Sequence, residues 1–146
     1  MDDDLSRLNL DQDFQEALAC EDATRWKLER PEPLVVLAAM SSAKQPEEVF
    51  QAQFRWTKYP DGPPSMKFRD MATGRVDVPT AWPVVRGFRP KSLDACVSWC
   101  AEGFALHPEW QKDPRYMWVS SGNVLLKVLR FLQGELDVHC QGRFRE

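Results

Sequence analysis

Apolar and polar side chains alternate in one segment of the first half of the chain. From residue 50 to residue 56 every second side chain is apolar, namely Phe50, Ala52, Phe54 and Trp56. The positions between them are polar and hold Gln51, Gln53 and Arg55. This period of two predicts a strand with one buried face. The alternation returns at residues 65–68, which predicts a second strand there.

Prolines separate these two segments. Pro60 follows Tyr59 a few residues after the first strand, and Pro63 stands directly before Pro64 at the start of the second. Proline has no N–H for a strand ladder, and it restricts the residue before it to extended backbone. The segment between the strands is therefore expected to be a tight, proline-fixed turn.

Two earlier apolar runs also predict strands. Residues 26–28 place Trp26 and Leu28 on one side, and residues 34–40 read LVVLAAM. Pro31 and Pro33 are expected to bound the turn between them. Four strands joined by short turns favour a local antiparallel meander.

Helical periodicity marks both ends of the chain. Residues 4–19 carry an imperfect apolar stripe of Leu5, Leu8, Phe14, Ala17 and Leu18. The last segment has a clearer stripe at spacings of three and four, made of Leu125, Val128, Leu129, Leu132 and Leu136. Ser120 or Ser121 is its expected N-cap. Glycine and proline interrupt residues 69–89, so an irregular loop anchored by Trp82 is expected there.

These elements predict one domain, residues 1–146, of the α+β class, with a four-stranded antiparallel meander flanked by N- and C-terminal helices. The formal charge of −3 and the scattered Lys and Arg argue against a nucleic-acid partner. No apolar run has the length of a membrane span. The acidic start lacks the pattern of a secretion signal, so a cytoplasmic location with reduced cysteines is expected.

The strand, Tyr-Pro turn, Pro-Pro pair and second strand around residues 50–68 resemble the strand–YPxxPP–strand signature of the ubiquitin-conjugating (UBC-like) fold. The order of elements along the chain is also that of the fold. The resemblance implies an enzyme that accepts a ubiquitin-like protein from an activating enzyme and holds it as a cysteine thioester. Such an enzyme then transfers it to an amine of a protein substrate. The resemblance implies no cofactor.

The segment after the long loop carries the candidate chemistry and departs from the family's pattern. Cys96 has apolar neighbours, as the active-site cysteine of the family does. Cys100, in contrast, has the better spacing from Pro90 before it and Trp110 after it. Either is a candidate nucleophile, and the flanking residues favour Cys96. No His-Pro-Asn turn precedes them, and Phe88-Arg89-Pro90 is the nearest equivalent, so the asparagine that would stabilise an oxyanion is missing. Such departures resemble divergent prokaryotic members, which implies a bacterial conjugation system, for example one for antiphage defence.

His107, in LHPEW, is a candidate general base for the amine, or a residue that orients the loop or caps a turn. Two alternatives stay open. The missing asparagine fits a non-catalytic UBC-like module that binds a ubiquitin-like protein or another partner as a scaffold. A structural zinc site is the other, because Cys96, Cys100, His107 and either His139 or Cys140 have zinc-binding side chains, although their spacing matches no finger pattern. The preferred interpretation contains no metal.

Overall fold

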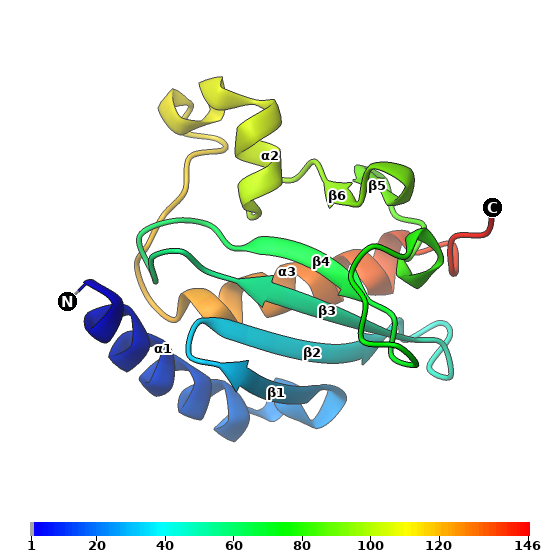
Figure 1. Ribbon diagram of the computed structural model, residues 1–146, viewed down its shortest axis with the longest axis horizontal. Coiled ribbons are helices and arrows are strands. Elements are labelled where there is room, and N and C mark those ends of the chain that lie inside the picture. Colours follow the sequence, from blue (N-terminus) through cyan, green and yellow to red (C-terminus); the bar gives the residue numbers. More distant parts are fainter. Residues whose placement is uncertain (1) are drawn as a thin grey trace.

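The computed structural model describes residues 2–146, and Figure 1 shows their arrangement. Helix α1 (Asp2–Ala19) precedes the strands β1 (Lys27–Glu32), β2 (Val35–Ser41), β3 (Val49–Arg55) and β4 (Ser65–Arg69). After the long loop come the short strands β5 (Phe88–Arg89) and β6 (Asp94–Ala95), and then helices α2 (Ala101–Leu106) and α3 (Val124–His139). Strands β1 to β4 form one antiparallel sheet in sequence order. The α+β class and the four-stranded meander with helices at both ends are confirmed.

The core lies between one face of the sheet and α3. The expected stripe of α3 is fully buried, at Leu125, Val128, Leu129, Leu132 and Leu136. The alternating apolar residues of β3 are buried in the same core, where Phe50, Ala52 and Phe54 are at most 1% exposed. Burying one such large side chain contributes about 1.5–3 kcal/mol, so this layer holds the C-terminal helix firmly on the meander. Trp82, the expected anchor of the long loop, is also fully buried.

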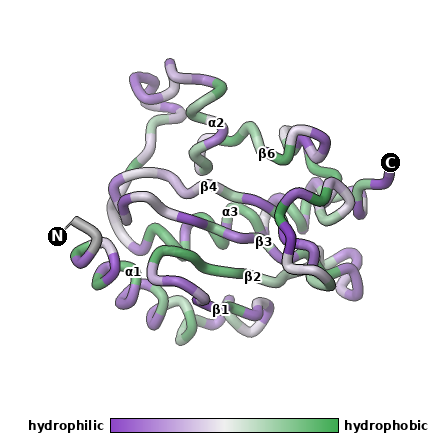
Figure 2. Tube along the Cα trace, viewed as in Figure 1, coloured by the Kyte–Doolittle hydropathy of each residue, from purple (hydrophilic) through white to green (hydrophobic). Residues whose placement is uncertain are grey.

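Strand β2 is buried on both of its faces. Val36 and Ala38 belong to the core, and Val35 and Leu37 on the opposite face are at most 6% exposed. Figure 2 shows β2 as a hydrophobic strand, whereas β3 contains hydrophilic segments. A strand between two neighbours, buried on both faces, reads as a continuous apolar run, which explains the sequence LVVLAAM.

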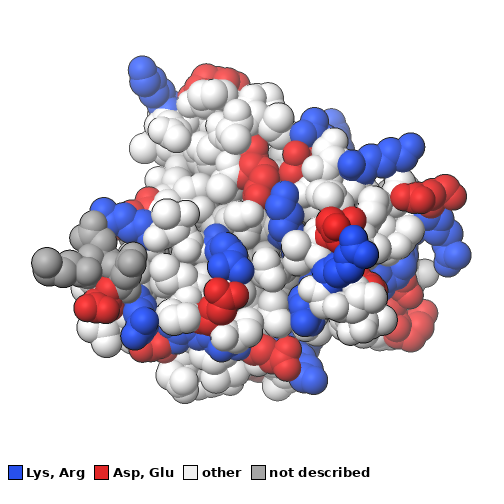
Figure 3. Space-filling model, in the orientation of Figure 1, with Lys and Arg blue, Asp and Glu red and all other residues white. Residues whose placement is uncertain are grey.

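Charges of both signs are interspersed on the face of the molecule shown in Figure 3. Neither Lys and Arg nor Asp and Glu gather there into a large patch of one sign. Within residues 2–146, no helix combines the length and the apolar character needed to cross a membrane.

Helix α1 buries only part of the stripe that the sequence indicated. Three leucines of that stripe are 45–63% exposed, namely Leu5, Leu8 and Leu18. Phe14 and Ala17 of the stripe are buried as expected, and Leu10, which lies outside the stripe, is buried with them. Hydrogen bonds fix the rotation of the helix about its axis, because Ser6 and Asp13 of this helix both bind Tyr59 and must therefore face inward.

The first strand also extends further than expected. β1 continues through Pro31, with an irregular register between Glu29 and Glu32. Because β1 lies at the edge of the sheet, the missing N–H of proline interrupts no second ladder. The turn therefore begins after Glu32, and the expectation that Pro31 already bounds it was wrong.

The N-cap of α3 is Asn123 rather than Ser120 or Ser121. The Asn123 side chain accepts the N–H of Leu126 at 2.9 Å, which satisfies one of the free donors in the first turn of the helix. Its amide nitrogen donates to the carbonyl of Asp13 at 3.0 Å, so the same residue links α3 to α1.

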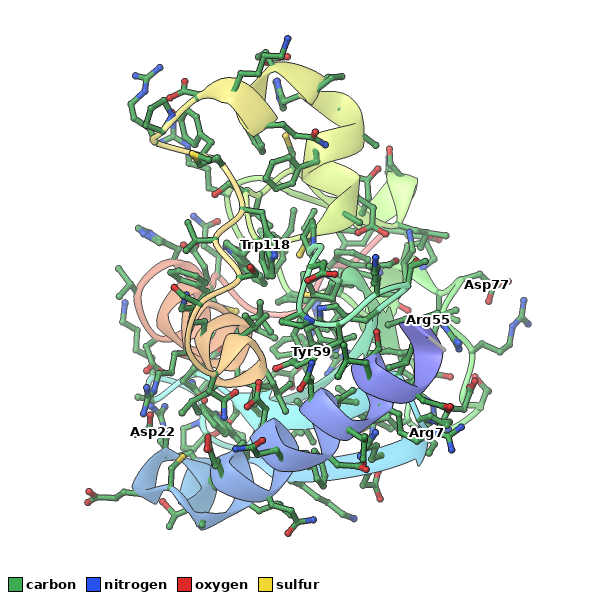
Figure 4. All side chains as sticks on the ribbon, turned by 90° about the vertical axis from the view of Figure 1, so that its left-hand side faces the viewer. Arg7, Asp22, Arg55, Tyr59, Asp77 and Trp118 are labelled. Carbon is green, nitrogen blue, oxygen red and sulfur yellow. The ribbon has the colours of Figure 1, made fainter. Side chains whose placement is uncertain are left out.

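Tyr59 connects the turn after β3 to both terminal helices, and Figure 4 shows it between α1 and α3. Its phenol donates to the carboxylate of Asp13 and accepts the N–H of Leu125 at 3.0 Å. Its backbone N–H donates to the hydroxyl of Ser6 at 3.1 Å. Burial, and next the hydrogen bond to Asp13, raise the pKa of Tyr59 far above its usual value, so the phenol remains a donor.

Replacing Tyr59 with phenylalanine tests this connection. Tyr59→Phe leaves Asp13 and the N–H of Leu125 without their buried partner, so we expect a loss of about 1–3 kcal/mol in the free energy of unfolding. Urea denaturation measures the loss. Tyr116→Phe is the control, because Tyr116 is 37% exposed and should change stability little. Equal stability of the two variants would contradict this role of Tyr59.

Candidate functional site

The hairpin of β5 and β6 leads directly into Cys96. Phe88 pairs with Ala95, and both side chains are buried in the core. Arg89 pairs with Asp94 on the opposite face of the hairpin. The pairing continues one step further, because the N–H of Cys96 donates to the carbonyl of Gly87 at 2.8 Å. The hairpin therefore fixes the backbone of Cys96.

The side chain of Cys96 lies on the open face of this hairpin. Side chains alternate along a strand, so Cys96 shares the face of Asp94 and not that of buried Ala95. Its partner across the hairpin is Gly87, which has no side chain and a φ of 89° that favours glycine. Cys96 is half-buried, and its thiol is free.

Cys100 lies in a different environment. It stands at the N-cap position of α2 and is fully buried. Burial, and next the negative charge of Glu102, raise the pKa of the Cys100 thiol well above its usual value. A carrier needs an accessible thiolate. Between the two cysteines named from the sequence, the structure therefore favours Cys96.

Helix α2 is tied by its first residues to the outer edge of β4. The N–H of Ala101 donates to the carbonyl of Pro64 at 2.7 Å. The carboxylate of Glu102 accepts hydrogen bonds from the Ser65 hydroxyl and from the N–H of Met66, the latter at 3.2 Å. These bonds fix the end of residues 96–100, which we call the cysteine loop.

Gly103 allows the cysteine loop to lie directly on α2. A Cβ atom at this position would overlap the carbonyl oxygen of Val97, far closer than any real contact. The backbone of Val97 therefore fills the space where another residue would have its side chain. Within the described chain, the N–H groups of Val97, Ser98 and Trp99 make no hydrogen bond.

The structure does not bring His107 to the cysteines. It ends α2, whose length places its Cα about 10 Å from that of Cys100. Its ring stacks on Trp110 with centroids 4.4 Å apart, and its Nδ1 lies 3.0 Å from a carboxylate oxygen of Glu109. Its carbonyl accepts the N–H of Trp110 at 3.0 Å. These contacts favour a role in the turn over a role as a base.

The zinc alternative finds no support. Among residues 2–146, no three His, Cys, Asp or Glu side chains are grouped so that they could hold a metal ion. His139 and Cys140 lie at the C-terminal end of α3, where the Cys140 sulfur accepts the N–H of Gly142 at 3.4 Å. Cys100, in contrast, is buried at the start of α2.

A groove of about 250 Å³ begins at the cysteine loop. Trp99 and Phe131 stack along it with centroids 6.0 Å apart. Met117 and Val119 line it from the segment before α3, and both are about half exposed. Lys127, also in its lining, is the one cation there that makes no ion pair within the described residues. The lining of the groove is more apolar than polar, and Lys127 adds a positive charge to it.

The role of the residues that place Cys96 was not identified from the sequence, which named Arg89 only as part of Phe88-Arg89-Pro90. Arg89 and Asp94 form an ion pair across the hairpin, and Glu102 holds α2. The polar Arg89 and Asp94 flank the buried Phe88 and Ala95, which is a period-two signal, but each strand has only two residues and the signal is too short to recognise.

Replacing Gly103 with alanine tests the contact of the cysteine loop with α2. Gly103→Ala should lower the free energy of unfolding by about 3 kcal/mol, because the new methyl group overlaps the Val97 carbonyl. Gly134→Ala is the matched control, since no atom lies within 4 Å of the point that its Cβ would occupy and alanine favours a helix by about 1 kcal/mol. Urea denaturation should show a lower free energy of unfolding for Gly103→Ala and a higher one for Gly134→Ala. Two stabilised variants would contradict the contact.

Thiol labelling tests the different exposure of the two cysteines. In a Cys20→Ser, Cys140→Ser background, iodoacetamide should modify native Cys96 and leave Cys100 unmodified until urea unfolds the protein. The raised pKa of the Cys100 thiol acts in the same direction, because it keeps the group protonated near pH 8. Mass spectrometry of peptides locates the label. Equal labelling rates for both cysteines would show that Cys100 is not buried.

A scan against protein-family models, a search of the curated proteins and a search of the solved structures each find no match to this chain. The function is therefore inferred from the residues and the geometry described above. The resemblance to the UBC-like fold remains a prediction from the sequence.

Proposed function

We propose that this chain carries a ubiquitin-like protein as a thioester on Cys96 and transfers it to an amine of a target protein. The observation that carries the proposal is the placement of Cys96. It is a half-buried free thiol on the open face of a hairpin, and its backbone is fixed by the bond to Gly87. The order of the elements and the YPxxPP turn give independent support from the sequence.

Loading is a thiol–thioester exchange. The Cys96 thiolate attacks the carbonyl carbon of the modifier's thioester on an activating enzyme. A C–S bond to Cys96 forms while the C–S bond to the activating enzyme breaks, and the sulfur of that enzyme leaves as a thiolate. The step consumes no oxidant and needs no cofactor of this chain.

Transfer to the amine passes through a tetrahedral intermediate. The amine nitrogen attacks the thioester carbonyl, whose oxygen becomes negatively charged, and the amine gives its proton to solvent. The C–S bond then breaks, and Cys96 is released as a thiolate. The free N–H groups of Val97, Ser98 and Trp99 make the cysteine loop a source of donors for this oxyanion.

The groove beside the cysteine loop fits the segment of the modifier that leads to the thioester. It starts at Ser98, two residues from the carrier, and its apolar walls suit an extended chain with small or apolar side chains. Lys127 would favour an acidic residue in that segment. A non-catalytic scaffold would need neither a partly exposed thiol nor backbone N–H groups without hydrogen-bond partners beside it.

A thioester assay tests the proposal. The chain is incubated with ATP and with the activating enzyme and ubiquitin-like protein encoded in the same genome. We expect a non-reducing gel to show an adduct that dithiothreitol removes. Cys96→Ala should abolish the adduct, and Cys100→Ala, which removes only the buried thiol, should keep it.

Two results would reject carriage on Cys96. One is an adduct that survives Cys96→Ala. The other is binding of the ubiquitin-like protein, seen by calorimetry, with no thiol-sensitive adduct, which is the behaviour of a scaffold.

A further inference from the structure

The proposed transfer to an amine has backbone donors for its oxyanion in the cysteine loop, but no side chain has yet been assigned to that role. Negative charge develops on the carbonyl oxygen, and enzymes stabilise such charge with fixed donors. The asparagine expected before the cysteine is missing, and Phe88-Arg89-Pro90 occupies its place. Within that segment only the Arg89 side chain can donate a hydrogen bond.

Arg89 lies on the same face of the hairpin as Cys96. It pairs with Asp94, two residues before Cys96, and side chains two residues apart in a strand share one face. Arg89 is thus the diagonal neighbour of Cys96 across the hairpin. Gly87, whose carbonyl accepts the N–H of Cys96 across the hairpin, has no side chain there.

Asp94 holds the Arg89 guanidinium in a fixed orientation. Nε donates to one carboxylate oxygen at 2.7 Å, and Nη2 donates to the other at 2.8 Å. The Asp94 side chain is only 16% exposed, so the pair is anchored at its acidic end. This two-point contact leaves the Nη1 amino group of Arg89 without a hydrogen-bond partner among the described residues.

The negative charges of Asp94 and of an ionised Cys96 both stabilise the protonated Arg89 side chain. The hydrogen bond and charge of Asp94 raise the pKa of the Arg89 guanidinium above its usual value, and an ionised Cys96 adds to this effect. A protonated guanidinium is therefore present at every pH at which Cys96 acts.

We infer that Arg89 is a catalytic residue whose free Nη1 group donates a hydrogen bond to the acyl oxygen of a thioester on Cys96. The inference rests on the proposed function. The bond strengthens as the amine attacks and the oxygen becomes an oxyanion, and it also stabilises the thiolate that leaves. Arg89 gains and loses no proton in the step, since the amine proton passes to solvent. Asp94 is a positioning residue that acts through Arg89.

The experiment uses a chemical acyl donor, so it needs no activating enzyme. The Cys20→Ser, Cys140→Ser protein is acylated on Cys96 with a short peptide thioester of 2-mercaptoethanesulfonate that ends in glycine. The purified acyl protein is mixed with butylamine at pH 8. Intact-mass spectrometry follows the loss of the acyl group and the appearance of the peptide butylamide.

We expect Arg89→Ala to take up the acyl group fully and to discharge it about ten- to a hundred-fold more slowly. This lies below the roughly 10²–10³-fold effect of an oxyanion donor in a water-excluded site, because the Arg89 side chain is 46% exposed. Arg89→Lys keeps the positive charge but lacks the several N–H donors of the guanidinium, so its discharge rate should be intermediate. Arg86→Ala, which removes an exposed arginine from the same loop, should discharge at the parental rate.

Methylguanidinium ions distinguish catalysis from a structural role. Added at millimolar concentration, they should partly restore discharge by Arg89→Ala and leave the parent unchanged. Two results would overturn the role of Arg89 and leave the proposed function untouched. One is discharge of Arg89→Ala at the parental rate. The other is a loss of rate that methylguanidinium does not restore, together with a lower melting temperature. A parent protein that takes up no acyl group on Cys96 would contradict the proposed function itself.

Discussion

The attachment of α2 to the edge of β4 determines where the cysteine loop lies. Ala101 donates to Pro64, and Glu102 accepts from Ser65 and Met66, so the edge strand finds its partners in a helix instead of a fifth strand. This also protects the edge from pairing with another chain. With its far end held there and its near end held by the β5–β6 hairpin, the loop from Cys96 to Cys100 has little freedom.

The two cysteines serve this arrangement in different ways. Cys100 is a small, fully buried residue at the start of α2. Cys96, at the other end of the anchored loop, stays partly exposed. The proline-rich turn thus has a direct structural consequence, because Pro64 supplies the carbonyl that receives α2.

Sequence patterns predicted those parts of the fold in which burial repeats with a regular period. Phe50 to Trp56 and the leucine stripe of α3 have such a period, and both are buried as expected. The rotation of α1 was not predictable, because it depends on Tyr59, 53 residues from its partner Ser6. The same holds for the site, where Glu102 binds Ser65 across 37 residues and Arg89 needs the register of a two-residue hairpin. Cys96 was favoured over Cys100 from its flanking residues and stays a proposal, whereas the geometry of His107 fits the turn that it was also expected to cap.

The central claim is that Cys96 is an acyl carrier, and the most direct measurement is the intact mass of the protein taken from the cells that encode it. The chain, carrying an affinity tag, is purified at mildly acidic pH without reductant, because acid keeps thioesters from hydrolysis and exchange. The account predicts a fraction whose mass exceeds that of the chain by one small protein, that loses this mass with dithiothreitol, and that disappears in Cys96→Ala. An added mass that survives dithiothreitol, or that persists in Cys96→Ala, would contradict it.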